Sequence, residues 1–283
     1  MASKDREHIR KLREEANALR QKEEARRRRN RMLTQVGIVI GAVVVIGAIV
    51  LLVVMGPKWF GNQRTPESSG MIEVTDSEGQ PVEVPITVSN DGILVGEEDA
   101  PDVIDYYFDF SCPHCAEYHA VVDEDIKTLI ADGEVQVNYH MIRFVAEYGL
   151  LAGATTAAVI EYQPELFYTV MDGLFAVPAE QQTGWSYDDY SQHLATLGVT
   201  STEAIEDTAN GEFSWWLSDR TDQARKDGIP GTPTIMIDGE IQEQLPVSAE
   251  EFRAIIAGEE LPEPSVEAPI STQEQSPAET PAG

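Results

Sequence analysis

The chain has 283 residues and a formal net charge of −29, because 49 Asp and Glu residues outnumber 20 Lys and Arg residues. The charge is unevenly divided: residues 1–35 hold 12 basic and 6 acidic residues, which leaves 8 basic and 43 acidic residues for the rest. The strong negative charge after residue 35 argues against a nucleic acid partner, since nucleic acids are bound by clustered Lys and Arg. The asymmetry indicates that the two parts face different surroundings.

An apolar segment, residues 36–55, follows the basic one and contains no charged or strongly polar side chain. A helix of this length is roughly 30 Å long, which matches the hydrocarbon thickness of a bilayer. We therefore expect one transmembrane helix in contact with membrane lipid, with residues 1–35 in the cytoplasm and the rest outside. A cleaved signal peptide is the alternative, although residues 54–58 offer no good cleavage site.

The chain beyond this helix divides into three parts. Residues 56–70 contain Gly, Pro, Asn, Gln and Ser, which predicts a short linker. Residues 71–258 are numerous enough to bury one substantial core and are expected to form the folded domain. Residues 259–283 are acidic, rich in Pro and without apolar periodicity, so we expect a disordered tail.

Apolar periodicity predicts an α/β fold for the domain. Short strands are expected over residues 82–88 and 92–96, and a central strand over residues 103–110. Residues 113–131 show helical spacing of apolar side chains, and residues 135–144 return to strand character. This order is a β-α-β unit, whose two strands run parallel through a right-handed crossover.

A helical insertion at about residues 145–227 is predicted next, from a change in composition to Ala, Leu, Glu, Gln and Thr. Its expected helices lie near residues 147–163, 164–176, 187–197 and 201–226. A strand at 234–237 and an Asp238-Gly239 hairpin turn follow. Ser248, with Glu251 three residues later, predicts the capped start of a last helix over about 249–257.

Cysteine occurs only in the tetrad Cys112-Pro113-His114-Cys115, at the predicted junction of strand and helix. A disulfide across two intervening residues closes too short a loop to stabilise the chain, so it suits a redox switch better. Cys112 at the helix N-terminus would have its thiolate stabilised by free N–H groups and the helix dipole. Pro113 suits the first helical turn, and a protonated His114 would stabilise the thiolate further.

These effects favour the reduced, ionised form and predict an oxidising dithiol, in which Cys115 is the more buried and less reactive thiol. Zinc sites also use CxxC pairs, but the sequence has no second CxxC, and His119, His140 and His193 show no paired ligand spacing. The acidic residues 123–125 lack the pattern of a calcium loop. We expect neither a metal nor another cofactor, and a purely structural disulfide stays an alternative.

The residues 109–115, the helical insertion and Gly231-Thr232-Pro233-Thr234 together resemble the DsbA family of thiol-disulfide oxidoreductases, which have a thioredoxin fold. The resemblance covers roughly residues 86–258 and extends to membrane-anchored DsbA-like proteins of Gram-positive bacteria. It implies that Pro233 forms a cis peptide bond beside the dithiol and that Thr232 and Pro233 bind substrate. From the residues alone, an ordinary turn explains Pro233 better than a cis peptide bond does.

One departure from related folds concerns a buried carboxylate that they place six residues before the first cysteine. Tyr106 occupies that position here, while Asp105 and Asp109 fall seven and three residues before Cys112. Strand alternation puts both aspartates on the face opposite Tyr106. We therefore assign neither of them a role in proton transfer.

The resemblance implies an extracytoplasmic oxidase of the cell envelope that introduces disulfides into exported proteins with cysteine pairs. It also implies a membrane partner of the DsbB or vitamin K epoxide reductase type, which reoxidises the dithiol and passes the electrons to quinone. A reductase or isomerase on the same fold is one alternative. A non-enzymatic, membrane-anchored binding protein with a structural dithiol is another.

Overall fold

The computed structural model describes residues 64–261 and, before them, Arg26, Met32 and residues 35–38, 41–47 and 49. The chain divides into two units, Met1–Gln63 and Arg64–Gly283. The described residues of the first unit are helical. Among all described residues, no helix is both long and apolar enough to cross a bilayer. The transmembrane helix expected over residues 36–55 lies partly outside them and stays a prediction, as do the linker up to residue 63 and the tail from residue 262.

A seven-stranded sheet forms the centre of the second unit, in the order β1-β2-β3-β5-β4-β6-β7. Its strands are β1 (Ser68–Thr75), β2 (Pro81–Ser89), β3 (Gly92–Val95), β4 (Asp102–Phe108), β5 (Val135–Met141), β6 (Thr234–Ile237) and β7 (Glu240–Ile241). Strands β4 and β5 are parallel and are joined by α2 (Pro113–Ala131), whereas β4 and β6 are antiparallel. The predicted β-α-β unit is therefore confirmed.

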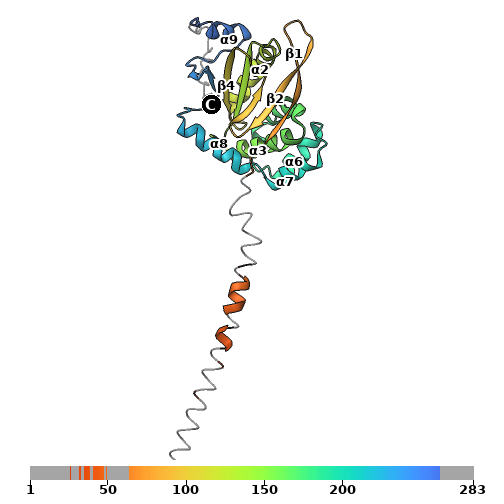
Figure 1. Ribbon diagram of the computed structural model, residues 1–283, viewed down its shortest axis with the longest axis vertical. Coiled ribbons are helices and arrows are strands. Elements are labelled where there is room, and N and C mark those ends of the chain that lie inside the picture. The colour runs from red at the N-terminus through yellow and green to blue at the C-terminus, as the bar shows by residue number, and fades with distance from the viewer. Residues whose placement is uncertain are drawn as a thin grey trace, which may run out of the picture. The chain divides into compact units, whose positions relative to one another are not determined.

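The helical insertion lies between β5 and β6, as the composition predicted. It contains α3 (Glu147–Tyr162), the 3-10 helix η1 (Pro164–Leu166), α4 (Phe167–Phe175), α5 (Ala179–Gln182), α6 (Tyr187–Thr196), α7 (Thr202–Asn210) and α8 (Ser214–Lys226). Figure 1 shows α3, α6, α7 and α8 gathered toward one end of the sheet. The single helix expected over residues 201–226 is two helices, because Gly211 ends α7 in the left-handed conformation, with φ +63°.

The two ends of the sheet differ in how well the sequence predicted them. Strand β1 begins at Ser68, three residues before the predicted start of the domain, and it pairs with β2 along its whole length. At the other end, Asp238 (φ 50°) and Gly239 (φ 82°) form the expected hairpin turn. The last helix, α9 (Ala249–Ile256), begins at Ser248, whose hydroxyl accepts a hydrogen bond from the Glu251 N–H.

Strand β4 positions the functional residues because its side chains alternate between two environments. Ile104, Tyr106 and Phe108 are buried on the face that α2 covers, and Asp105 and Tyr107 are only partly buried on the other face. Helix α2 turns Cys115, Tyr118 and Val122 toward the sheet, among other side chains. The dithiol therefore lies over a dry aromatic layer.

Candidate active site

Cys112 is the N-cap residue of α2, where the sequence placed it. Its backbone is extended (φ −87°, ψ 117°), and Pro113 occupies the first turn of the helix. The Cys112 N–H donates to the Asp109 carbonyl at 2.9 Å, and the Cys112 carbonyl accepts from the Cys115 N–H at 3.0 Å. The thiol of Cys112 therefore stands at the positive end of the helix dipole, next to N–H groups without helical partners.

The loop before β6 borders this thiol. The Thr232–Pro233 peptide bond is cis, as the resemblance implied. The Cys112 thiol donates to the Thr232 carbonyl, with a sulfur–oxygen distance of 3.4 Å. Strand pairing explains the placement, because Tyr107 near the end of β4 lies opposite Thr234 at the start of β6. The structure thus brings Cys112, Thr232 and Pro233 together from positions 120 residues apart.

The two cysteines are free thiols in unequal environments. Cys112 is 6% exposed, whereas Cys115 is completely buried. Burial raises the pKa of the Cys115 thiol far above its ordinary value, although hydrogen bonds from the Asp109 backbone and the Thr232 side chain act in the opposite direction. Cys115 is therefore a protonated, inaccessible thiol at neutral pH, and Cys112 is the one that a substrate can reach.

His114, between the two cysteines, faces solvent. Its side chain is 81% exposed, and its Nδ1 lies 3.3 Å from the Glu117 carboxylate, one helical turn further on. An ion pair this exposed contributes little to stability. The influence of Pro113 and His114 on the Cys112 thiolate stays a prediction, as do the substrate-binding roles of Thr232 and Pro233.

Asp109, which the sequence left without a role, holds the active-site loop. Its buried carboxylate accepts hydrogen bonds from the Ser111 N–H (2.8 Å), the Ser111 hydroxyl (2.5 Å), the Phe144 N–H (2.7 Å) and the Val145 N–H (2.8 Å). Asp109 follows the last residue of β4, so strand alternation no longer governs its direction. Ser111, which sequence reasoning missed, also accepts from the Ala146 N–H at 2.9 Å.

Helix α3 packs directly on this network through Gly149. A Cβ atom added to Gly149 would overlap the Asp109 carboxylate and crowd the Ser111 hydroxyl. The first turn of α3 and the loop before Cys112 are therefore held against each other. Because Asp109 binds both segments, it fixes the loop that positions the dithiol.

A second polar cluster lies further along α2, where the sequence predicted no ligand pairing. His119 and Asp123 are one turn apart on α2, and Asp172 from α4 joins them, with ligand atoms within 4.8 Å of one another. His119 Nε2 lies 2.7 Å from Asp172, and the Lys127 ammonium pairs with Asp123. Opposite charges pair within the cluster and Asp172 is exposed, so we explain it as a partly buried ion-pair network.

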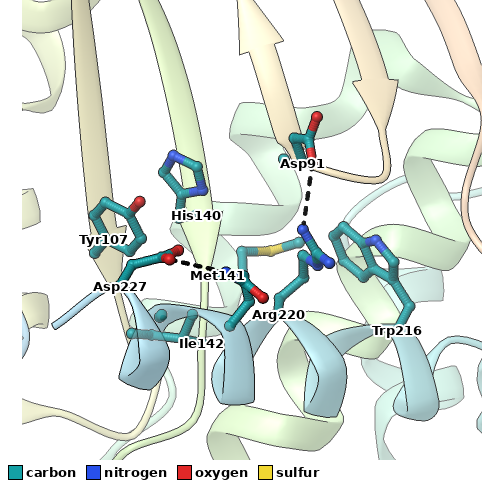
Figure 2. Close-up of a pocket in the computed structure, with 11 residues that line it drawn as sticks. Asp91, Tyr107, His140, Met141, Ile142, Trp216, Arg220 and Asp227 are labelled. Carbon is teal, nitrogen blue, oxygen red and sulfur yellow. Dashed lines mark hydrogen bonds and ion pairs between the residues drawn. The ribbon is translucent and has the colours of Figure 1, made fainter. Parts of the chain in front are cut away.

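A cavity of about 340 Å³ lies on the opposite face of the sheet, between the strands and α8. Figure 2 shows Tyr107 and His140 on the strand side and Arg220 between Asp91 and Trp216. The Tyr107 and His140 rings stack with centroids 4.1 Å apart, and Arg220 lies 3.5 Å from Asp91. The sheet separates this cavity from α2, so it is not part of the dithiol site.

Comparison with known proteins places this geometry in a family. The family model described as Thioredoxin matches residues 88–257, which is more than half of the chain. The chain belongs to the thioredoxin family. The matched region begins within β2 and ends just after α9, so it covers the dithiol, the helical insertion and the cis-proline loop.

The curated relatives include a protein kinase and a disulfide bond formation protein. Serine/threonine-protein kinase PknE of Mycobacterium tuberculosis is 29% identical over 124 residues, which cover 41% of this chain and 22% of the kinase. The chain therefore matches only about a fifth of the length of the first curated relatives. Disulfide bond formation protein D of Bacillus subtilis is 22% identical over 184 residues, 64% of this chain and 78% of that protein.

Two solved structures share the fold. The MdbA thiol-disulfide oxidoreductase of Actinomyces oris has a TM-score of 0.52 and 19% identity, over 60% of this chain and 86% of that one. BdbD of Bacillus subtilis has a TM-score of 0.51 and 19% identity, over 66% of this chain and 97% of that one. Together with the relatives, they confirm the DsbA-like resemblance and the thioredoxin-like α/β fold expected from the sequence.

Proposed function

We propose that this chain is a thiol-disulfide oxidoreductase that introduces disulfides into exported proteins. One observation carries the proposal: Cys112 stands at the N-terminus of α2 beside the Thr232 carbonyl, and Cys115 lies completely buried behind it. Such a pair has one thiol for attack by substrate and one for closing the disulfide. The names of disulfide bond formation protein D and of MdbA support the same chemistry.

The reaction starts from the oxidised chain. A substrate thiolate attacks the Cys112 sulfur, the Cys112–Cys115 bond breaks, and its electron pair goes to the Cys115 sulfur, which then takes a proton. A second substrate thiolate attacks the substrate sulfur of the mixed disulfide and releases Cys112 as a thiolate. The substrate loses two electrons and gains a disulfide, and the chain is left with two reduced cysteines.

The direction of the reaction follows from which form of the dithiol the fold stabilises. The helix N-terminus favours negative charge on Cys112 in the reduced form, and no such charge exists in the disulfide. Pro113 opens the helix without needing a hydrogen-bond partner, and His114, when protonated, adds a positive charge close by. The dithiol is therefore an oxidant, which gives up its disulfide to substrates.

Substrate binding is proposed at the loop that borders the reactive thiol. Thr232 and Pro233 flank the Cys112 sulfur and are partly exposed. A peptide lying against them would present its own cysteine to Cys112 in line with the disulfide. The substrates are exported proteins with cysteine pairs, whose thiols are still reduced when they reach the outer surface.

The proposed location is the outer side of the cell membrane. Residues 36–55 anchor the chain in lipid, residues 1–35 lie in the cytoplasm, and the thioredoxin domain faces outward. Repeated turnover then requires an oxidant in the same membrane. We propose a quinone-linked reoxidase of the DsbB or vitamin K epoxide reductase type as this partner.

The test uses the oxidised full chain in mild detergent and a reduced peptide with two cysteines. Wild type should oxidise the peptide stoichiometrically. Neither Cys112→Ser nor Cys115→Ser can form the Cys112–Cys115 disulfide, so both should leave the peptide reduced. When the same peptide is supplied as its disulfide, Cys112 of Cys115→Ser should attack it, release one peptide thiol and accumulate as a mixed disulfide. An inactive wild type contradicts the proposal and favours the anchored binding protein. Activity only in reducing insulin contradicts the oxidase direction.

The location has a separate test in intact cells. A protease added outside should remove the domain at residues 64–261 and leave an epitope tag at the N-terminus protected. Protection of both ends, or release of the whole chain into the medium, contradicts the proposed anchor. The peptide assay tests the activity and the protease experiment tests the location, so either proposal can fail without the other.

A further inference from the structure

The cavity of Figure 2 is lined by two residues whose buried N–H groups have no acceptor. Trp216 and Arg220 lie one helical turn apart on α8, and both line the cavity. Trp216 is only 1% exposed, and within residues 64–261 neither its indole Nε1 nor the Nε of Arg220 has a hydrogen-bond partner. Buried N–H groups are nearly always hydrogen-bonded. The two donors therefore call for an acceptor from outside the described chain.

The charge of Arg220 favours an anionic acceptor over a neutral one. Its Nη2 donates to the Asp219 carboxylate at 2.7 Å, and its Nη1 lies 3.5 Å from the carboxylate of Asp91, which is 86% exposed. The contact with Asp91 is long and solvated, so it binds the guanidinium weakly. A hydrogen bond from the guanidinium Nε to a charged oxygen is stronger than one to a neutral carbonyl.

The rest of the cavity is largely apolar and flat. Ile142 and Ala224 are buried and belong to a small apolar cluster apart from the main core. The rings of Tyr107 and His140 are stacked, with centroids 4.1 Å apart and planes 6° apart. Figure 2 shows this pair on the left and Trp216 on the right. Aromatic walls of this kind bind the flat body of an aromatic ligand well.

Two carboxylates on the cavity wall limit the charge of the ligand. Asp227 accepts a hydrogen bond from the side chain of Gln223 at 2.8 Å, and Asp91 contacts Arg220 as described above. Both carboxylates are negative at neutral pH and repel further negative charge. The cavity therefore favours a ligand with a single negative charge over a dicarboxylate or a phosphate ester.

We propose that this cavity binds a small aromatic carboxylate, whose oxygens accept hydrogen bonds from Trp216 Nε1 and Arg220 Nε. The aromatic body of the ligand lies over Ile142 and Ala224, against the Tyr107–His140 pair. The volume of about 340 Å³ is near the lower end of ligand pockets, so it fits a compound of one ring and not a long peptide. The sheet separates the cavity from the dithiol, so this proposal stands or falls independently of the proposed function.

The first test follows the indole N–H groups by NMR, in the full chain labelled with ¹⁵N-tryptophan and with benzoate as the probe. Trp215 is the internal control, because it is 37% exposed and does not line the cavity. The Trp216 signal, assigned with Trp216→Phe, should shift until the site is saturated, and the Trp215 signal should not. An unmoved Trp216 signal at about 10 mM benzoate overturns the proposal, because the donors then bind only water.

The second test separates the carboxylate from the aromatic ring. Benzamide has the same ring and an acceptor oxygen but no charge, and phthalate carries a second carboxylate. Calorimetric titration should give benzoate the lowest dissociation constant, with both other compounds roughly tenfold or more weaker. Equal affinities for benzoate and benzamide overturn the assigned chemistry.

The third test compares two arginines of the same helix. Arg220→Lys keeps the charge but removes the Nε donor, whereas Arg225→Lys changes an arginine that pairs with Asp222 and does not line the cavity. We expect the dissociation constant for benzoate to rise roughly tenfold in the first variant and less than about twofold in the second. Equal constants in wild type and Arg220→Lys overturn the proposal.

A second pair of variants replaces the first if Arg220→Lys does not fold. Trp216→Phe removes a donor that has no partner in the described structure, so the fold should tolerate it. Calorimetry should show weaker binding of benzoate to Trp216→Phe than to Trp215→Phe. Equal binding by these two variants also overturns the proposal.

Discussion

The two faces of strand β4 carry adjacent residues into opposite environments. Tyr106 is buried under α2 in an aromatic layer with Cys115, and its hydroxyl lacks a partner in the described structure. On the other face Asp105 accepts hydrogen bonds from Asn138 at 3.1 Å and from His140 at 2.7 Å, and His140 lines the cavity of Figure 2. We call the apolar face of β4 that holds Tyr106 the dry face, and the face that holds Asp105 the wet face. Negative charge on a thiol is unfavourable on the dry face, whereas charged groups on the wet face are paired.

This difference teaches where the chemistry can lie. A carboxylate or imidazole on the wet face is paired and partly solvated, so it changes little when the dithiol changes state. A thiol on the dry face responds strongly to the loss or gain of charge, because few polar atoms surround it. The pairing of an accessible Cys112 with a dry Cys115 therefore defines the site.

The largest expected effect on stability comes from removing the buried carboxylate of Asp109, compared with removing the partly buried carboxylate of Asp105. Asp109→Ala leaves the N–H groups of Ser111, Phe144 and Val145 without their acceptor, so we expect a loss of about 3 kcal/mol or more in unfolding free energy. Asp105→Ala on the wet face should cost about 1 kcal/mol. Urea denaturation measures both, and equal losses would contradict the contrast.

A packing change should weaken the same loop by a smaller amount. Gly149→Ala forces a methyl group into the Asp109 carboxylate, and overpacking of this kind costs about 1–3 kcal/mol. Gly231→Ala is the control, because open space surrounds Gly231. We expect denaturant unfolding to shift for the first variant alone. An unchanged midpoint for Gly149→Ala would show that α3 does not press on the active-site loop.

The dry face also predicts a pH dependence of the reduced chain. The folded-state pKa of Cys115 lies above the ordinary thiol value, so the folded state holds this proton more tightly than the unfolded state. The stabilisation is present below about pH 8.5 and is lost at up to about 1.4 kcal/mol per pH unit as the pH rises above it. Cys115→Ala should flatten this fall between pH 8.5 and 10, as followed by urea titrations at each pH. An equal slope in both chains would contradict the burial of Cys115.

The smallest expected effect sharpens the comparison between neighbouring tyrosines. Burial, with help from the charge of Asp105, raises the pKa of Tyr107 to about 12, and burial also raises the pKa of Tyr106 well above the ordinary tyrosine value. Tyr107→Phe should therefore remove a single absorbance transition of phenolate near that pH and change exchange rates less than about twofold. Loss of exchange activity in Tyr107→Phe would place chemistry on the wet face.

The sequence predicted the frame of the site well, because local signals mark it. The bounds of α2 follow from Pro113 and the apolar spacing. The turn at Asp238-Gly239 follows from the residue types, because Asp and Gly tolerate the positive φ that both adopt here. Strand β1 was not predicted, because its small and polar first residues, Ser68 to Gly70, were assigned to the linker and the rest only to the domain. The break in the last insertion helix depended on the conformation of Gly211.

The contacts inside the site were beyond sequence reasoning for a physical reason. The donors that Asp109 accepts from lie up to 36 residues away, and Asp172 joins His119 from 53 residues away. Strand alternation correctly separated Asp105 from Tyr106 but failed for Asp109, which comes after the strand ends. The buried, unpaired state of the Tyr106 hydroxyl depends on packing from three elements, which no local pattern reports.

The reduction potential of the full chain tests the central claim, that an unequal pair of thiols at a helix N-terminus acts as an oxidant. The chain would be equilibrated in glutathione buffers and its dithiol state followed by tryptophan fluorescence. A potential near about −120 mV is expected, because stabilisation of the Cys112 thiolate makes the disulfide easier to reduce. A potential near about −270 mV, typical of a reductase, would contradict the account.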